Sequence, residues 1–584
     1  MSSILRGVVA VNRVPSRWRF ALRAAFCMAV PAAVGLALGD IAAGLAATIG
    51  GFTALYGSGR PYAYRAAELG VIAVALATAV ALGDAAAAIP WLGVVTATGI
   101  AAVAVLICQA LAIGPPGAYM IALACAAGVG ISAEGESPWR LWVLVLAGGA
   151  FSWSVHMAGA LVRFRGPERA AVAAAERAVN ALGALTAEVE RERAVDAAAR
   201  ALHESWVVLM TLQPAGTPGA ELHRLRIENH RLHVRFAALV SGGPIPDPGA
   251  EPEPDTLPFG RPSGWRLVLA AVRGSHARHV AAQVAVAALI AGGIATVLGV
   301  ERGYWAIAAA VLVLYNGFDR TRTLVRGVQR LLGTLAGLGL AGVVLGLHPQ
   351  GVWLIVLLLV LQFLIEMLVV RNYALAAVVI TPAALTIGSG GRPVDDLGEL
   401  LLTRGVDTVI GCAVAFAVLL LGGQRYDAQR VDRALADALD ACAALVPHLA
   451  AGTVTTREAR AARRDAQTSA IAVLLAYDSA VAGGSASRGA AERLWPAVTA
   501  AQRVTYRMLA ACWQLQHSDE APPLTEAEAA RLAAVLEAAA RFGSNGPEAA
   551  AASSRREAAP PDGQRDPAPA FAAADIAILT RALT

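Results

Sequence analysis

Ionisable side chains interrupt two apolar stretches in the C-terminal half of the chain. Glu366 lies near the end of the first stretch, and Arg371 and Asn372 follow it directly. Arg404 and Asp407 lie inside the second stretch. A charge at the centre of a membrane helix costs on the order of 3 kcal/mol, so a charge kept there needs a partner or a water-filled cavity. Because a carboxylate can exchange a proton and an arginine can hold a carboxylate ligand, these residues predict a pathway for protons or organic anions.

The spacing of these residues leaves structural alternatives open. Arg404 and Asp407 are three residues apart, so they share a helix face and could simply pair with each other. Glu366 and Arg371 are five apart and lie on different faces, so each needs a partner from another helix. Arg371 begins an apolar segment, so the alternative role of its side chain is simply to reach the lipid headgroups. A functional role is favoured for Glu366 and Asp407.

The elements that must position these residues are apolar helices. The chain is 57% hydrophobic and 16% charged, with a mean hydropathy of +0.56, which lies outside the soluble globular range. Crossing the hydrocarbon layer takes about 20 apolar residues of helix, and runs rich in Leu, Ala and Val without alternation predict helices. We expect spans near residues 20–39, 41–58, 67–86, 90–112, 117–133 and 139–162, and again near 279–299, 303–318, 328–347, 350–370, 372–389 and 403–423.

The apolar pattern occurs twice in the chain, which predicts an internal repeat. Tyr56 of the first copy matches Tyr315 of the second, and Tyr119 matches Tyr373. Gln109 stands roughly where Glu366 does, and Arg140 lacks a carboxylate three residues further on, so the ionisable positions are not kept. The second copy is therefore expected to carry the chemistry. The predicted fold class is an all-α polytopic membrane protein with two parallel repeats of about six transmembrane helices, each followed by a cytosolic helical domain.

The distribution of arginine predicts the orientation of both copies. By the positive-inside rule, loops rich in arginine face the cytoplasm. Such loops precede the first segment of each copy, follow the second and follow the sixth; they carry Arg6, Arg13, Arg17, Arg19, Arg60, Arg65, Arg163, Arg165 and Arg169, and then Arg266, Arg273, Arg278, Arg320, Arg322, Arg326, Arg330, Arg425 and Arg430. We therefore expect a multi-pass protein of the plasma (cytoplasmic) membrane with both termini in the cytoplasm and with parallel repeats.

Charge and composition divide the chain into domains. Charged, Ala/Arg-rich segments with helical spacing follow each apolar copy, and stretches rich in Pro, Gly and acidic residues separate them. The predicted domains are a first transmembrane bundle at 1–165, a cytosolic helical domain at 166–241, a linker at 242–264, a second transmembrane bundle at 265–423, a C-terminal cytosolic helical domain at 424–543, a disordered linker at 544–570 and a short terminal helix at 571–584.

Several classes of protein are disfavoured by what the sequence lacks. No CxxC pair occurs among the six cysteines, and His223, His230 and His233 are not spaced as metal ligands, so no metal site is expected. No phosphate-binding loop is present, so no nucleotide or other cofactor is expected. Arginines border apolar segments instead of forming a stripe with aromatics, which argues against nucleic acid. No catalytic constellation lies in the spans, and an enzyme is not expected.

A series of short motifs in the second copy resembles a known family. In order along the chain they are Tyr304–Trp305–Ala306, Arg330–x–x–Gly333–Thr334–x–x–Gly337, Glu366 with Arg371–Asn372–Tyr373, Thr381–Pro382, and Arg404–x–x–Asp407–Thr408–x–x–Gly411. The series resembles the fusaric acid resistance and aromatic acid exporter family of bacterial inner-membrane proteins, with plant aluminium-activated malate transporters as distant relatives. The resemblance implies a proton-driven exporter of aromatic carboxylates or similar amphipathic anions, often working with envelope partners.

Most of the motif residues also have a structural interpretation. Small residues allow membrane helices to approach closely, so structure is favoured over function for Arg330, Gly333 and Thr334. Tyr304 and Trp305 are expected at the membrane border, where an aromatic belt explains them. The motif residues assigned to structure are Tyr304, Trp305, Arg330, Gly333, Thr334, Gly337, Tyr373, Thr381, Pro382 and Gly411.

The sequence as a whole favours a plasma-membrane transporter. The expected activity is proton-coupled efflux of aromatic carboxylates or other small amphipathic organic anions, and Glu366, Arg371, Asn372, Arg404 and Asp407 are the candidate pathway residues. A passive organic-anion channel and an envelope scaffold that does not transport are the alternatives. The expected partners are the lipid bilayer and the anion, with a homo-oligomer or envelope proteins as further candidates.

Overall fold

The computed structural model describes residues 10–11, 17–131, 137–185, 188–210, 219–241, 264–273, 275–300, 303–317, 320–394, 396–421, 425–481, 485–517, 524–554 and 572–583. Within these ranges the secondary structure is helical and no strand occurs, which confirms the all-α prediction. Two predicted linkers lie largely outside the described residues. These are residues 242–263 of the linker at 242–264 and residues 555–570 of the linker at 544–570.

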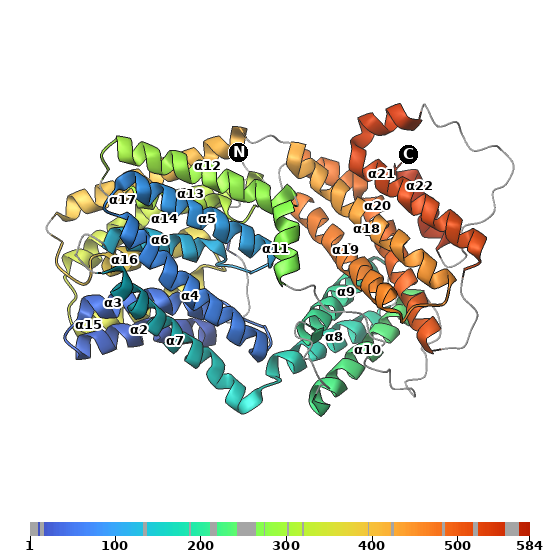
Figure 1. The fold of residues 1–584 in the computed structure, drawn as a ribbon, viewed down its shortest axis with the longest axis horizontal. Coiled ribbons are helices and arrows are strands. Elements are labelled where there is room, and N and C mark those ends of the chain that lie inside the picture. The colour runs from blue at the N-terminus through green and yellow to red at the C-terminus, as the bar shows by residue number, and fades with distance from the viewer. Residues whose placement is uncertain are drawn as a thin grey trace. The chain divides into compact units, whose positions relative to one another are not determined.

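The chain divides into two compact units, whose helices are labelled in Figure 1. The first unit, called the membrane unit below, contains residues 1–164 and 262–423, and the second, called the helical unit, contains residues 165–261 and 424–584. Each predicted apolar span therefore lies in the membrane unit. Both charged segments lie in the helical unit.

The membrane unit contains two successive sets of apolar helices. The first set is α2 (Trp18–Ala37), α3 (Ile41–Gly51) with the 3-10 turn η1 (Phe52–Leu55), α4 (Tyr62–Ala86), α5 (Pro90–Ala110), α6 (Ala118–Ile131) and α7 (Pro138–Arg163). The second set is α12 (Ser275–Val297), α13 (Tyr304–Leu314), α14 (Arg320–Gly346), α15 (Val352–Leu368), α16 (Tyr373–Gly388) and α17 (Leu397–Leu421). In the described residues, seven of these helices are long and apolar enough to cross a membrane, and the other five are shorter.

The exposed faces of these helices are apolar, as expected for contact with lipid. On α15, Val352, Val356, Val360 and Leu364 follow one another at intervals of four residues and are exposed. The opposite face of the same helix is buried and includes Glu366. A helix of a soluble protein would place its polar residues outside, so this inverted pattern identifies lipid as the solvent of α15.

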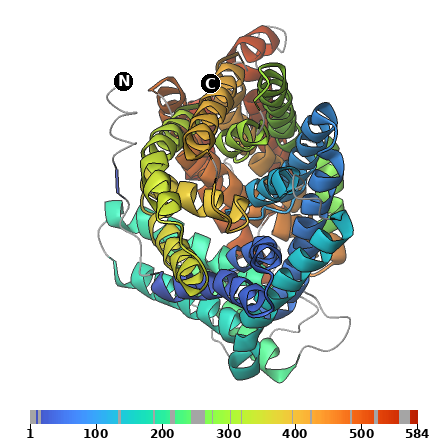
Figure 2. The ribbon, with the colours of Figure 1, turned by 90° about the vertical axis from the view of Figure 1, so that its left-hand side faces the viewer.

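The two sets of helices pack against each other through reciprocal pairs. The first helix of the first set, α2, packs on the fourth helix of the second set, α15. The first helix of the second set, α12, packs on the fourth helix of the first set, α5. Figure 2 shows α2 and α3 in dark blue beside the yellow helices of the second set. Within each set, the third helix packs on the fifth and the sixth: α4 on α6 and α7, and α14 on α16 and α17.

Glycines permit the closest helix contacts of the second set. A Cβ atom at Gly333 of α14 would lie 2.4 Å from the carbonyl oxygen of Ala374 on α16, and one at Gly411 of α17 would lie 2.3 Å from the carbonyl oxygen of Ala306 on α13. No side chain fits at such separations. These motif glycines therefore set the distance between helix pairs, as small residues commonly do in membranes.

A short helix precedes the second set. This helix, α11 (Gly264–Arg273), packs on α5 and is followed directly by α12. Its residues are half-buried or exposed, and none is fully buried.

The helical unit is assembled from both charged segments. Its helices are α8 (Gly166–Ala184), α9 (Glu188–Met210), α10 (Ala220–Ser241), α18 (Arg425–Ala450), α19 (Arg457–Val481), α20 (Ser485–His517), α21 (Glu526–Ser554) and α22 (Ala573–Leu583). Leu202 and Phe236 from the first segment share a core with Ile471 and Tyr506 from the second. The two segments, which are predicted to be separate domains, thus share one hydrophobic core.

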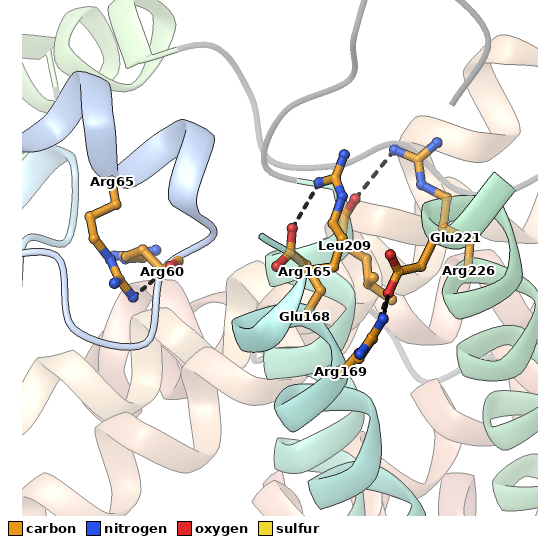
Figure 3. A network of polar contacts seen from close by, with 8 residues as sticks. All are labelled: Arg60, Arg65, Arg165, Glu168, Arg169, Leu209, Glu221 and Arg226. Carbon is orange, nitrogen blue, oxygen red and sulfur yellow. Dashed lines mark hydrogen bonds and ion pairs between the residues drawn. The ribbon is translucent and has the colours of Figure 1, made fainter. Parts of the chain in front are cut away.

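Polar contacts connect α8, α9 and α10 at their ends (Figure 3). Arg165 forms an ion pair with Glu168, in which Nη1 and Oε1 are 2.8 Å apart, and Arg169 pairs with Glu221 of α10. Arg226 of α10 donates a hydrogen bond to the carbonyl oxygen of Leu209, 3.2 Å away. In the membrane unit, Arg65 donates to the carbonyl oxygen of Arg60 and thereby closes the turn before α4.

Candidate anion-binding cavity

A cavity of about 390 Å³ lies between the two sets of helices in the membrane unit. Both sets contribute to its wall, which is mainly apolar and aromatic. The first set supplies Arg17, Phe20, Met28, Thr48, Phe52, Leu55, Pro115, Pro116, Tyr119, Met120 and Leu123; the second supplies Leu312, Tyr315, Arg326, Leu358, Gln362, Ile365, Glu366, Val369, Val370, Tyr373, Ile380, Ala383, Ala384 and Ile387.

Glu366 is the carboxylate of this cavity. Its side chain is only 7% exposed, and its Oε2 lies 3.8 Å from Nη2 of Arg17, the residue that precedes α2. Gln362, one turn earlier on α15, donates a hydrogen bond of 3.2 Å from Nε2 to Oε1 of Glu366. The carboxylate thus has one cationic and one neutral partner, and its cation comes from the other set of helices.

Arg326 supplies a second cation, which is surrounded by aromatic rings. Its guanidinium carbon lies 4.6 Å from the ring centroid of Tyr373 and 5.6 Å from that of Tyr315. Nη2 of Arg326 also donates to the hydroxyl of Tyr315, 3.3 Å away, and the ring of Tyr119 lies 6.1 Å from that of Tyr315. Cation–π contacts of this kind hold a guanidinium in place without neutralising its charge. The cavity therefore has a positively charged, aromatic wall.

Arg330 lies behind this wall. It is 1% exposed and donates from Nη1 to the hydroxyl of Tyr373 over 3.4 Å, but it does not line the cavity. Tyr373 therefore lies between Arg330 and the cavity: it lines the cavity, and its hydroxyl accepts the hydrogen bond from Arg330.

Arg404 and Asp407 are buried in α17, away from the cavity lining. The guanidinium carbon of Arg404 lies 3.6 Å from the ring centroid of Trp305. Among the described residues, none of the three side-chain nitrogens of Arg404 and neither carboxylate oxygen of Asp407 has a hydrogen-bond partner. The pairing that their spacing permits is thus not a hydrogen bond in this structure. Trp305 is 6% exposed and covers Arg404, so it is not a lipid-facing belt residue.

Arg371 and Asn372 lie at the turn between α15 and α16. Asn372 is the N-cap of α16, where its Oδ1 accepts hydrogen bonds from the backbone nitrogens of Ala374 and Leu375 at 2.8 and 3.2 Å. Such a cap stabilises a helix by about 1 kcal/mol. Arg371 is half-buried and is not part of the cavity wall. The structure therefore gives Asn372 a structural role and leaves Arg371 outside the cavity wall.

The remaining motif residues make helix–helix contacts or bonds within a helix. Thr381 donates to the carbonyl oxygen of Ala377, 2.9 Å away, and Pro382 is buried inside α16. Thr334 is fully buried. A Cβ atom at Gly337 would lie 2.8 Å from the carbonyl oxygen of Val378. The ring of Tyr304 lies 5.4 Å from that of Trp305.

Sequence reasoning missed most of the polar residues of the cavity. The sequence pattern places Arg17 and Arg326 only among the arginines that predict orientation, and it does not single out Gln362. The interval of four residues between Gln362 and Glu366 is a signal that could have paired them on one helix face. The contacts of Arg17 and Arg326 come from other helices, and no local spacing predicts them.

The histidines considered for a metal site occupy the helical unit. His230 and His233 contact the aromatic rings of Trp513 and Trp206. Within the described residues, no group of three or more His, Cys, Asp or Glu side chains is arranged to hold a metal ion.

Comparison with known proteins locates the family likeness in the second set of helices. Residues 289–418 match the family described as fusaric acid resistance protein-like. The chain is 25% identical to the membrane protein YvaC of Bacillus subtilis (strain 168), over 92% of this chain and 91% of the relative. Two proteins of Escherichia coli (strain K12) match shorter parts.

Of these, YhfK is 31% identical over 23% of this chain and 19% of its own length, and the inner membrane protein YccS is 30% identical over 21% and 16%. No solved structure matches. The family match lies on the helices that contribute Arg326, Glu366 and Tyr373 to the cavity. It confirms the resemblance read from the motifs: residues 289–418 are similar to the fusaric acid resistance protein-like family, and they belong to a multi-pass membrane protein with several apolar helices.

Proposed function

We propose that this protein is a plasma-membrane transporter that exports small amphipathic organic anions, such as aromatic carboxylates, in a proton-coupled cycle. The observation that carries the proposal is the cavity between the two sets of helices. It combines an apolar and aromatic wall with two arginines and one carboxylate. Its volume lies in the range of sites for small molecules, about 300 to 1,000 Å³.

The polar groups of the cavity suit a carboxylate ligand. The rings of Tyr119, Tyr315 and Tyr373 supply surfaces for an aromatic ligand, and Arg326 is positioned among them. An arginine binds a carboxylate through charge-assisted hydrogen bonds. Because Arg326 makes aromatic contacts and has no ion pair among the described residues, its charge remains available to an anion.

The contact between Arg17 and Glu366 supplies a physical basis for proton coupling. Glu366 competes with a substrate carboxylate for the guanidinium of Arg17, 3.8 Å away. A proton on Glu366 removes this competition and frees Arg17 for the substrate. Binding of the anion and of a proton would therefore favour each other, so occupancy of the anion site would depend on the protonation of Glu366.

The topology belongs to the same proposal. The reciprocal packing of α2 on α15 and of α12 on α5 supports two parallel repeats with the substrate path between them. The arginine-rich loops favour cytoplasmic termini and a cytosolic helical unit. The description of YccS as an inner membrane protein supports the plasma membrane as the location.

Transport by the purified chain in proteoliposomes tests the proposal. With an imposed pH gradient, we expect accumulation of aromatic carboxylates such as benzoate against their own gradient, no transport of benzamide, and loss of accumulation in Glu366→Gln. Large anion currents that ignore the pH gradient would instead establish a passive channel. Absence of transport for all acids tested, with an unaltered sensitivity profile of cells that carry Glu366→Gln, would leave the scaffold alternative.

A further inference from the structure

Helix α11 has an exposed apolar ridge. Trp265, Leu269 and Val272 are spaced as i, i+4 and i+7, so they lie on one side of the helix, and they are 73%, 36% and 45% exposed. The half-buried residues Leu267 and Ala271 lie on another side. The ridge is thus formed by large apolar residues that the described part of the chain leaves uncovered.

The position of α11 places this ridge at the border of the membrane unit. The helix packs on α5 near the end of that span, where a Cβ atom at Gly264 would lie 3.4 Å from Cδ2 of Leu111, the residue that caps α5. The spanning helix α12 begins at Ser275, directly after α11. The ridge therefore lies at the level where one span ends and the next begins.

All charged side chains in and directly after α11 are arginines. Arg266 and Arg273 are seven residues apart and exposed, and both lie beside the apolar ridge on the same side of α11. Arg278 follows in α12, and residues 264–300 contain neither Asp nor Glu. An exposed tryptophan, an apolar ridge and flanking arginines are the features with which an amphipathic helix binds the surface of a bilayer that contains anionic lipid.

We propose that α11 lies in the interfacial layer of the bilayer and binds anionic phospholipids. Trp265, Leu269 and Val272 enter the boundary between headgroups and acyl chains, and Arg266 and Arg273 contact lipid phosphates. Helix α11 thereby anchors the start of the second set of helices at a fixed depth in the bilayer. This inference does not depend on whether the protein transports anions.

Depth measurements on the full chain in lipid nanodiscs test the position of the ridge. A nitroxide label is placed at Leu269→Cys or, as the matched control, at the exposed neighbour Ala270→Cys, which lies about 100° further around the helix; the native cysteines are all buried. We expect the label at 269 to be relaxed by oxygen and shielded from a water-soluble nickel complex, with the opposite result at 270. Equal access of the nickel complex to both labels would overturn the proposal. Shielding of residue 269 from both reagents would also overturn it, because a protein surface would then cover the ridge.

Lipid selectivity tests the role of the arginines. In nanodiscs of mixed phosphatidylglycerol and phosphatidylcholine, we expect Arg266→Gln or Arg273→Gln to reduce the preference for the anionic lipid next to the protein by about fivefold each. Arg457→Gln removes an equal charge from the helical unit and should leave the preference unchanged. An unaltered preference in the α11 variants would show that these arginines do not bind lipid.

Discussion

The guanidinium of Arg17 and the carboxylate of Glu366 connect the two sets of membrane helices. Nη2 of Arg17, at the start of α2, lies 3.8 Å from Oε2 of Glu366, near the end of α15. Both residues line the same cavity, and α2 packs directly on α15. A change in charge at either residue therefore acts on the cavity and on the junction between the two sets.

Removal of Arg17 should destabilise the membrane unit more than removal of Glu366. Arg17→Gln leaves the buried carboxylate of Glu366 with only its hydrogen bond from Gln362, whereas Glu366→Gln leaves the arginine, which is 31% exposed and can be hydrated. We expect Arg17→Gln to cost about 1 to 3 kcal/mol, the penalty for an unpaired buried charged group. Thermal unfolding of the purified protein in detergent measures the loss.

The double variant provides the control for this prediction. Arg17→Gln combined with Glu366→Gln removes both charges, so it should recover part of the stability that Arg17→Gln loses. Strictly additive losses in the two single variants would contradict an interaction between these side chains.

Arg326 should contribute to anion affinity, while Arg371 should not. Arg326 lines the cavity, and Arg371 lies outside its wall. Loss of a hydrogen bond to a charged group costs about 1.5 to 3 kcal/mol, so Arg326→Gln should weaken binding of an aromatic carboxylate by about 10- to 100-fold. Arg371→Gln removes the same charge from the adjoining turn and should leave the affinity unchanged. Titration calorimetry with benzoate compares the two variants, and equal losses in both would argue against the cavity as the binding site.

Gly333 should be intolerant of any side chain. Because a Cβ atom there would lie 2.4 Å from the carbonyl oxygen of Ala374, Gly333→Ala forces α14 and α16 apart. We expect a loss of about 1 to 3 kcal/mol, as for other overpacked sites. Gly339 lies on the same helix with nothing within 4 Å of its Cβ position, so Gly339→Ala should stabilise the protein slightly or leave it unaltered. Unfolding temperatures that fall equally in both variants would show that helix separation is not the cause.

The helical unit should lose stability as the pH falls. The pKa of His233 is lowered from 6.5 to about 4, mainly by burial, with smaller contributions from nearby His203 and Arg463, while its hydrogen bond to the carbonyl oxygen of Asn229 opposes the shift. Because that oxygen can only accept, Nδ1 carries the proton, and Nε2 accepts from Gln467 of α19, 3.2 Å away. The folded state therefore contains neutral His233.

The direction of the pH effect follows from this lowered pKa. Between pH 6.5 and about 4 the unfolded chain binds a proton at His233 that the folded chain does not. The contribution of His233 is thus complete above pH 6.5 and is lost as the pH falls toward 4, and it amounts to roughly 3 kcal/mol. Thermal unfolding from pH 7 to pH 4.5 measures it. His233→Gln should flatten the dependence, whereas His223→Gln on the same helix should not.

The amino-acid sequence alone predicted that the apolar segments form helices and that lipid surrounds these helices. Apolar segments without alternation can satisfy their backbone in lipid only as helices. The expected span near 67–86 lies within α4, and the one near 328–347 extends one residue beyond the end of α14 at Gly346. The motif series located the family likeness at the helices that residues 289–418 contain. Both results depend on short-range patterns, which a sequence displays directly.

The membership of the cavity was decided by tertiary structure. Of the predicted pathway residues, Glu366 lines the cavity, whereas Arg371, Arg404 and Asp407 do not; Arg17 and Arg326 line it instead. Arg17 is separated from Glu366 by more than half the chain and meets it only because α2 packs on α15. The side chains that share a cavity are determined by how the helices pack against each other. The periodicity of residues along a single helix does not predict that packing.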